Sequence, residues 1–145
     1  MRLFTIGFTK KSAERFFTLL RSAGAARVID TRLNNRSQLA GFTKGDDLPF
    51  FLREIASISY EHRLDMAPTQ DMLSRYKKHG ASWTTYEREF NQLLVDRQVA
   101  SRVTRAQLAD ACLLCSENEP NRCHRRLVAE YLAREWDHVD IVHLR

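Results

Sequence analysis

The sequence has 145 residues, about the length of one domain, and its 43% apolar and 28% charged residues fit a globular protein rather than a disordered chain. The 23 basic and 18 acidic side chains give a formal charge of +5, which favours anionic partners, either a small molecule or nucleic acid. No apolar run is long enough for a membrane span, and the 3 cysteines, an odd number, argue against a disulfide framework and for a soluble, cytoplasmic protein.

The N-terminal part of the chain alternates between strand and helix patterns. An apolar run over 3–6 is ended by Gly7, and it starts so close to Met1 that we expect no signal peptide. Ser12 is placed to cap a helix that Gly24 closes. A second strand is expected over 26–31, so the strand, helix and strand predict a right-handed crossover between parallel strands.

A polar stretch over 32–47 follows, and it is too long for an ordinary connection, which makes it a candidate functional loop. Beyond it we expect a helix over 48–56, a third strand over 58–60 and helical structure over 68–99. An apolar stripe in the last of these is expected to pack in the core rather than line a site: Tyr86, Phe90, Leu93 and Leu94.

The C-terminal part continues the same alternation. Thr84 followed by Glu87 fits a capping box within the helical region. The apolar run over 111–115 is typical of a central parallel strand covered on both faces. A helix is expected to start at Asn121 or a neighbour, and the last strand to cover 139–142.

These elements predict a single α/β domain over 1–145: a Rossmann-like three-layer sandwich with about five mostly parallel strands and flanking helices. No G-x-G-x-x-G follows the first strand, so a dinucleotide cofactor has no support. In a sheet of this kind, ligands bind beyond the carboxyl ends of the strands.

The reactive side chains follow the first, second and fourth strands, and we expect them to converge at that edge of the sheet. They are Gly7, Thr9, Asp30, Arg32, Arg36, Ser37, Cys115, Glu117, Cys123, His124 and Arg125. The last three are expected in the first turn of a helix, where free N–H groups favour anions and thiolates. The plainer interpretation is that the cysteine packs as a small apolar residue and the histidine covers the helix.

Several motifs along the chain resemble those of one family. They are T-I-G-F-T at 5–9, I-D-T-R at 29–32, L-L-C-S-E at 113–117, C-H-R at 123–125 and V-H-L at 142–144. Together they resemble the bacterial and archaeal family catalogued as domain of unknown function 488. The chain lacks the proline that family members commonly have near 33–35, and it has Leu64-Asp65-Met66 in place of their L-G-G, so it resembles a divergent branch. The resemblance implies the fold and the site more than a reaction.

Arg32 and Arg36 lie in a polar loop beside Asp30. Guanidinium groups at a sheet edge offer bidentate recognition of phosphate or carboxylate. The alternative is that Asp30 pairs with Arg32 or Arg125 and merely orders the loop.

Glu117 lies two residues beyond Cys115. It is a candidate general acid or base, a carboxylate that orients His124, or a counterion for Arg125. Cys112 and Cys115 have C-x-x-C spacing, but residues three apart in a strand point to opposite faces. We therefore expect Cys112 in the core.

The cofactor is not predicted. Cys115, Cys123 and His124 are a possible zinc or iron site, yet adjacent Cys123 and His124 would have to diverge to surround one ion, so no metal site is predicted.

The leading functional hypothesis is an enzyme, a hydrolase or transferase, that acts on a phosphate-bearing substrate such as a nucleotide, nucleoside or nucleic-acid end. The anion would be held by Arg32, Arg36 and Arg125, with Gly7, Thr9, Ser37 and Cys123 beside them. Asp30, Glu117 and His124 would handle protons, and Cys115 would be the nucleophile or a pocket wall. Two alternatives stay open: a non-catalytic nucleotide or nucleic-acid binding module, and a thiol redox or metal-binding module. The oligomeric state is not predicted.

Overall fold

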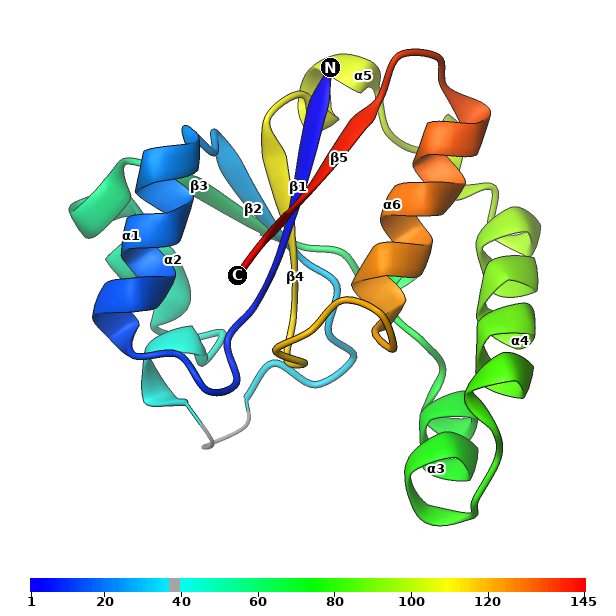
Figure 1. Ribbon diagram of the computed structural model, residues 1–145. Coiled ribbons are helices and arrows are strands. Elements are labelled where there is room, and N and C mark those ends of the chain that lie inside the picture. Colours follow the sequence, from blue (N-terminus) through cyan, green and yellow to red (C-terminus); the bar gives the residue numbers. More distant parts are fainter. Residues whose placement is uncertain (37–39) are drawn as a thin grey trace.

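The computed structural model describes residues 1–36 and 40–145. Its five strands form one sheet in the order β3-β2-β4-β1-β5, and each pairs with its neighbours in parallel (Figure 1). The strands are β1 (Arg2–Gly7), β2 (Arg27–Asp30), β3 (Ser59–His62), β4 (Ala111–Cys115) and β5 (Asp140–Leu144). The predicted α/β fold with mostly parallel strands is confirmed.

Helices cover both faces of this sheet and complete the three layers (Figure 1). They are α1 (Ala13–Ala23), α2 (Leu48–Phe51), α3 (Gln70–Lys78), α4 (Trp83–Asp96), α5 (Arg105–Leu108) and α6 (His124–Glu135). Helix α2 continues into a π-helical turn over Leu52–Ala56. The helices α1 and α2 lie on one face, whereas α6 and α4 lie on the other, with α3 beyond α4. Across the described residues, every helix is too short or too polar to cross a membrane.

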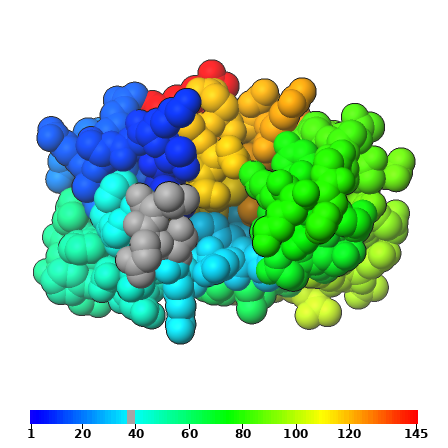
Figure 2. Space-filling view, turned by 90° about the horizontal axis from the view of Figure 1, so that it is seen from below, coloured from blue at the N-terminus to red at the C-terminus, as the bar shows by residue number. Residues whose placement is uncertain are grey.

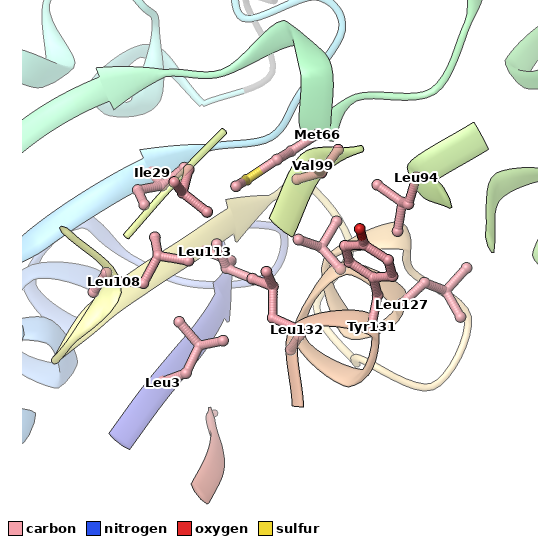
Figure 3. Packing of buried hydrophobic residues seen from close by; sticks show 14 of the residues in the cluster. Leu3, Ile29, Met66, Leu94, Val99, Leu108, Leu113, Leu127, Tyr131 and Leu132 are labelled. Carbon is pink, nitrogen blue, oxygen red and sulfur yellow. The ribbon is translucent and has the colours of Figure 1, made fainter. Parts of the chain in front are cut away.

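The core is divided by the sheet because successive strand residues point to opposite faces. Leu3 and Leu113 face α6 and pack with Leu127 and Leu132 (Figure 3). Phe4, on the opposite face, packs with the apolar side chains of α1 and α2. Each such buried side chain stabilises the fold by about 1.5–3 kcal/mol, so both layers are firmly attached to the sheet.

Helix α1 begins and ends where the sequence predicts. The Ser12 side chain accepts a hydrogen bond from the Arg15 N–H, and Gly24 closes the helix in the left-handed region with φ 75°. A residue with a Cβ is strained in that conformation, and glycine is not.

Two other helix starts were predicted wrongly. Helix α4 is capped by Ser82, whose side chain accepts from the Thr85 N–H, so the expected capping box of Thr84 and Glu87 does not form. Helix α6 begins at His124 rather than near Asn121, and the residues between β4 and α6 stay in a loop. Contacts from distant parts of the chain, described below, hold this loop.

The connections out of β4 and its neighbours determine where a crevice opens. The chain leaves β1 for α1 on one face and leaves β4 for α6 on the other (Figure 1). A crevice forms at the carboxyl ends of adjacent parallel strands whose connections diverge in this way. Cys115, the last residue of β4, lies at that point.

Candidate functional site

The carboxyl ends of β1, β2 and β4 meet at one edge of the sheet. Gly7 is the register partner of Cys115, and Asp30 that of Leu114. Figure 2 looks onto this edge, where the loop after β4 (yellow to orange), the segment after β2 (light blue) and α3 (green) adjoin one another. The three segments that the sequence selected therefore do begin side by side.

A cavity of about 110 Å³ lies between the sheet edge and the helices α3 and α4. Five of the predicted site residues line it: Arg32, Cys115, Glu117, Cys123 and His124. The other lining side chains include three aromatic and two cationic residues: Tyr76, Trp83, Tyr86, Lys77 and Arg122. The cavity thus combines thiols, an imidazole and positive charge.

Cys115 and His124 face each other at the base of the cavity. The Sγ atom of Cys115 lies 3.6 Å from Nδ1 of His124. On the other side of the ring, Nε2 lies 2.7 Å from the Thr31 carbonyl oxygen and 3.0 Å from the Thr31 hydroxyl. That hydroxyl donates to the Leu114 carbonyl at 2.8 Å, so it is an acceptor toward His124. Nε2 therefore carries a proton, and Nδ1 faces the sulfur.

The two buried thiols at this site differ in acidity. Burial opposes ionisation of Cys115, but the Cys123 thiol and His124 together hold its pKa well below the usual value. Burial and the neighbouring Cys115 sulfur raise the pKa of Cys123 well above the usual value. The pKa of His124 is also raised, against the effect of burial, by the charge of Cys115. These surroundings favour the thiolate form of Cys115, the form that attacks electrophiles and binds metals.

We expect iodoacetamide to label Cys115 much faster than Cys112 in the native, EDTA-treated protein at pH 7. Cys112 is completely buried on the opposite face, and burial raises its pKa, whereas Cys115 opens onto the cavity. Reactivity follows thiolate fraction and access, so we expect a rate difference of more than about tenfold by peptide mass spectrometry. Equal, slow labelling of both thiols would favour a packing role for Cys115.

Asp30, the last residue of β2, and Arg32 form a buried ion pair. The Asp30 carboxylate accepts from Nε of Arg32 at 2.9 Å, from Nη2 at 2.8 Å and from the Tyr60 hydroxyl at 2.6 Å. Nη2 also donates to the Thr43 carbonyl at 2.6 Å, and the guanidinium lies over the Phe8 ring. Asp30 does not line the cavity. Its carboxylate positions Arg32. This agrees with the alternative interpretation of the sequence, in which Asp30 pairs with an arginine and orders the loop.

Arg125 and Gly7 fix the loop that follows β4. Arg125 is completely buried, and its guanidinium donates to the Glu117 carbonyl at 2.5 Å and the Asn118 carbonyl at 3.3 Å. Its Nε donates to the Thr5 hydroxyl at 3.3 Å. Gly7 lies so close that a Cβ there would be 1.6 Å from the Glu117 carbonyl oxygen. Neither residue lines the cavity, so this placement favours a structural role over anion binding.

Glu117 lies at the mouth of the cavity, where its carboxylate accepts from Nζ of Lys77 at 2.9 Å. About half of each side chain is exposed. Burial lowers the pKa of Lys77, but the hydrogen bond with Glu117 outweighs burial, so the pKa is raised overall. Glu117 meets Arg125 through its backbone carbonyl rather than its carboxylate. The structure therefore pairs Glu117 with a residue that the sequence did not suggest.

Three other expected site residues lie away from the cavity or outside the description. Thr9 is exposed and donates from its hydroxyl to the Ser116 carbonyl. Arg36 is exposed, and its N–H donates to the Asn34 side chain. Ser37 lies outside the described residues.

The sequence alone did not identify the aromatic wall of the cavity, which consists of Tyr76, Trp83 and Tyr86, or the nearby cations Lys77 and Arg122. Tyr86 is buried as expected, but it also lines the cavity, together with Trp83 at the start of α4 and Tyr76 on α3. The Trp83 and Tyr86 rings stack with centroids 5.3 Å apart, and Tyr76 meets Trp83 at 5.7 Å. Leu93, expected in the same buried stripe, is only half-buried. Helical spacing indicates which residues share a face, but not that α3 reaches the sheet edge.

Cys115, Cys123 and His124 are also brought together as possible metal ligands. Their ligand atoms all lie within 4.8 Å of one another. Although Cys123 and His124 are adjacent in the chain, both place a ligand atom near Cys115. Cys123 has extended backbone, with φ −136° and ψ 139°, just before α6 begins, and this turn of the chain lets both side chains meet Cys115.

The fold and the cavity define a parallel α/β protein with a thiol and imidazole site where the connections of the sheet diverge. The chain belongs to the family described as Domain of unknown function DUF488, whose family model matches residues 12–132. No curated protein and no solved structure matches the sequence.

Proposed function

We propose that the protein is an enzyme, a hydrolase or transferase, that acts on a phosphate-bearing substrate such as a nucleotide or a nucleic-acid end. One observation carries the proposal: a single cavity at the carboxyl edge of the sheet is lined by the Cys115 and His124 pair and by the cations Lys77 and Arg122. Sites that combine such a reactive pair with positive charge suit anionic substrates. The three free cysteines support a reducing, cytoplasmic setting.

The size of the cavity indicates how the substrate would bind. Its volume of about 110 Å³ is well below the roughly 300–1,000 Å³ of sites that enclose a whole small molecule. It has room for one group, such as a phosphate, while the rest of the substrate lies outside the mouth. The Trp83 ring is already stacked on Tyr86 and lies under the Arg126 guanidinium. The aromatic wall therefore supplies a rim rather than a free stacking face.

The cationic residues would divide the work of holding the anion. Arg122 is exposed at the cavity wall, and Lys77 shares the mouth with Glu117. Arg32 lines the cavity, but its Nε and Nη2 are occupied by Asp30 and Thr43. We therefore assign the main phosphate contacts to Arg122 and Lys77 and a supporting charge to Arg32.

Replacing Arg122 by alanine is expected to weaken phosphate and nucleoside monophosphate binding about tenfold in isothermal titration. A hydrogen bond to a charged group contributes about 1.5 kcal/mol or more. We take the lower end of this range because the Arg122 guanidinium and the bound phosphate would both be partly exposed. Arg134→Ala is the matched control, since Arg134 is exposed near the end of α6 and does not line the cavity. Equal losses in both variants would mean that the binding reflects overall charge rather than this cavity.

A second variant, Glu117→Gln, separates an enzyme from a binding module. We expect it to retain or tighten phosphate binding, because it frees Lys77 from its carboxylate partner, and to abolish turnover, because it removes the proton acceptor. Product analysis over nucleosides, nucleotides and short DNA measures turnover. If the wild-type protein binds these compounds tightly and transforms none of them, the non-catalytic binding module replaces the enzyme.

A further inference from the structure

We propose that Cys115, Cys123 and His124 bind one zinc ion at the base of the cavity, with the fourth position of the ion open to the cavity. This inference deepens the proposed function, because the ion would lie next to the expected phosphate. It rests on the placement of three ligand atoms, on the orientation of the histidine ring and on the direction in which the site opens.

The spacing of the ligand atoms fits one tetrahedral ion. Zinc binds thiolate sulfur at about 2.3 Å and imidazole nitrogen at about 2.0–2.1 Å, which places two such ligands about 3.6 Å apart. The Cys115 Sγ and His124 Nδ1 atoms are 3.6 Å apart. The Cys123 sulfur completes a group in which every pair of ligand atoms lies within 4.8 Å. Small side-chain shifts would bring all three to one centre.

The histidine ring is oriented as a metal ligand would be. Nε2 is held by the Thr31 carbonyl at 2.7 Å, which fixes its proton there and turns the Nδ1 lone pair toward the two sulfur atoms. Metal-binding histidines almost always donate their other N–H to a carbonyl or carboxylate. Thr31 is itself buried and is joined to β4 through the Leu114 carbonyl, so this outer contact is part of the sheet.

The second thiol distinguishes a metal site from a simple cysteine and histidine pair. A nucleophilic thiolate needs only the imidazole beside it, whereas this site adds the buried Cys123 sulfur. Two thiolates would balance the charge of a divalent ion in the buried site. Thiolate and imidazole donors also select zinc over magnesium or calcium, which prefer oxygen.

The fourth position would face the proposed substrate. All three residues line the cavity, so the open side of the site points into it. Three protein ligands with an open position are typical of catalytic rather than structural zinc. In that position zinc supplies Lewis acidity to a phosphoryl oxygen or a water molecule. Lys77 and Arg122, on the cavity wall, would hold the anionic substrate beside it.

The test is a titration of the reduced, EDTA-treated protein with Zn²⁺ against a chromophoric chelator, and with Co²⁺ as a spectroscopic probe. We expect one ion per chain, a thiolate-to-cobalt absorption band and the visible bands of tetrahedral cobalt. Cys123→Ser and His124→Ala should each lower zinc affinity more than about 100-fold, beyond the 10–100-fold typical of outer partners. Cys112→Ser is the matched control, because Cys112 is buried on the opposite face, and it should leave the affinity unchanged.

Several results would overturn the inference. These are the absence of stoichiometric Zn²⁺ binding by the wild-type protein, an octahedral cobalt spectrum without a thiolate band, or a Cys123→Ser variant with unchanged affinity. The wild-type spectrum decides the matter even if a variant fails to fold. The proposed function fails separately. If the protein does not bind zinc but still binds phosphate, the proposed function stands and only the zinc site is refuted. If it binds zinc but no phosphate, only the proposed function is refuted.

Discussion

Replacing Gly7 by alanine is expected to destabilise the protein by more than about 3 kcal/mol, at the upper end of overpacking effects. A Cβ at this position would lie 1.6 Å from the carbonyl oxygen of Glu117 and 2.6 Å from its carbonyl carbon. These are backbone atoms, and the loop that carries them is held by the Arg125 guanidinium and by the Thr9 N–H, which donates to the Ser116 carbonyl at 3.0 Å. The loop can move aside only by losing those bonds.

Chemical denaturation measures this effect, and Gly41→Ala is the control. A Cβ at Gly41 meets nothing within 4 Å, so we expect that substitution to change the free energy of unfolding by less than about 0.5 kcal/mol. A Gly7→Ala variant as stable as Gly41→Ala would mean that the loop after β4 does not pack against β1. The cavity, which this loop helps to line, would then have a different shape.

Replacing Arg32 by methionine is expected to cost about 3–5 kcal/mol, because it leaves the carboxylate of Asp30 buried without its ionic partner. Asp30 is completely buried and Arg32 is 5% exposed. The double variant Asp30→Asn and Arg32→Met should recover much of the loss, since neither position of the pair then carries a charge. Arg36→Met, at an exposed arginine in the same loop, should have almost no effect.

Urea denaturation of the four proteins provides the comparison. A double variant no more stable than Arg32→Met would show that the lost packing and hydrogen bonds of Arg32, rather than the unpaired charge, dominate. An Arg32→Met variant as stable as Arg36→Met would contradict the buried pair itself. The same reasoning makes Arg32 a poor probe of phosphate binding, because its loss disturbs the sheet edge. Arg122 and Lys77 are better probes.

The fold could be predicted because its strands and most of its helices follow local sequence patterns that tertiary contacts do not override. Alternating strand and helix signals indicate parallel crossovers, and the caps at Ser12 and Gly24 define α1 through contacts within a few residues. The strand alternation that placed Cys112 in the core also held. Each of these inferences depends on the chain near the residue in question, which is why the sequence was sufficient.

The interior of the site depends on contacts that no local pattern contains. The Arg125 side chain holds carbonyls of the loop after β4, which keeps α6 from starting near Asn121. The placement of α3 brings Tyr76 and Lys77 to the sheet edge, although their spacing resembles that of any surface helix. Reactive residue types at strand ends were therefore found, while their partners were not.

Two sequence expectations about charge also depended on packing. Arg32 and Arg125 were grouped as anion ligands because both follow strands, yet one pairs with Asp30 and the other with backbone carbonyls. Burial separates these arginines from the exposed Arg122. Arg32 and Arg122 lie in loops, where no helix or strand periodicity indicates which side chain is buried.

A crystal structure of the protein soaked with a nucleoside monophosphate, at a concentration that saturates binding in solution, shows whether the cavity binds the phosphate. We expect a phosphate in the cavity, within hydrogen-bond distance of Arg122 or Lys77 and next to Cys115 and His124. A nucleotide bound only elsewhere, for example at the start of α1, with the cavity holding only solvent, would contradict it.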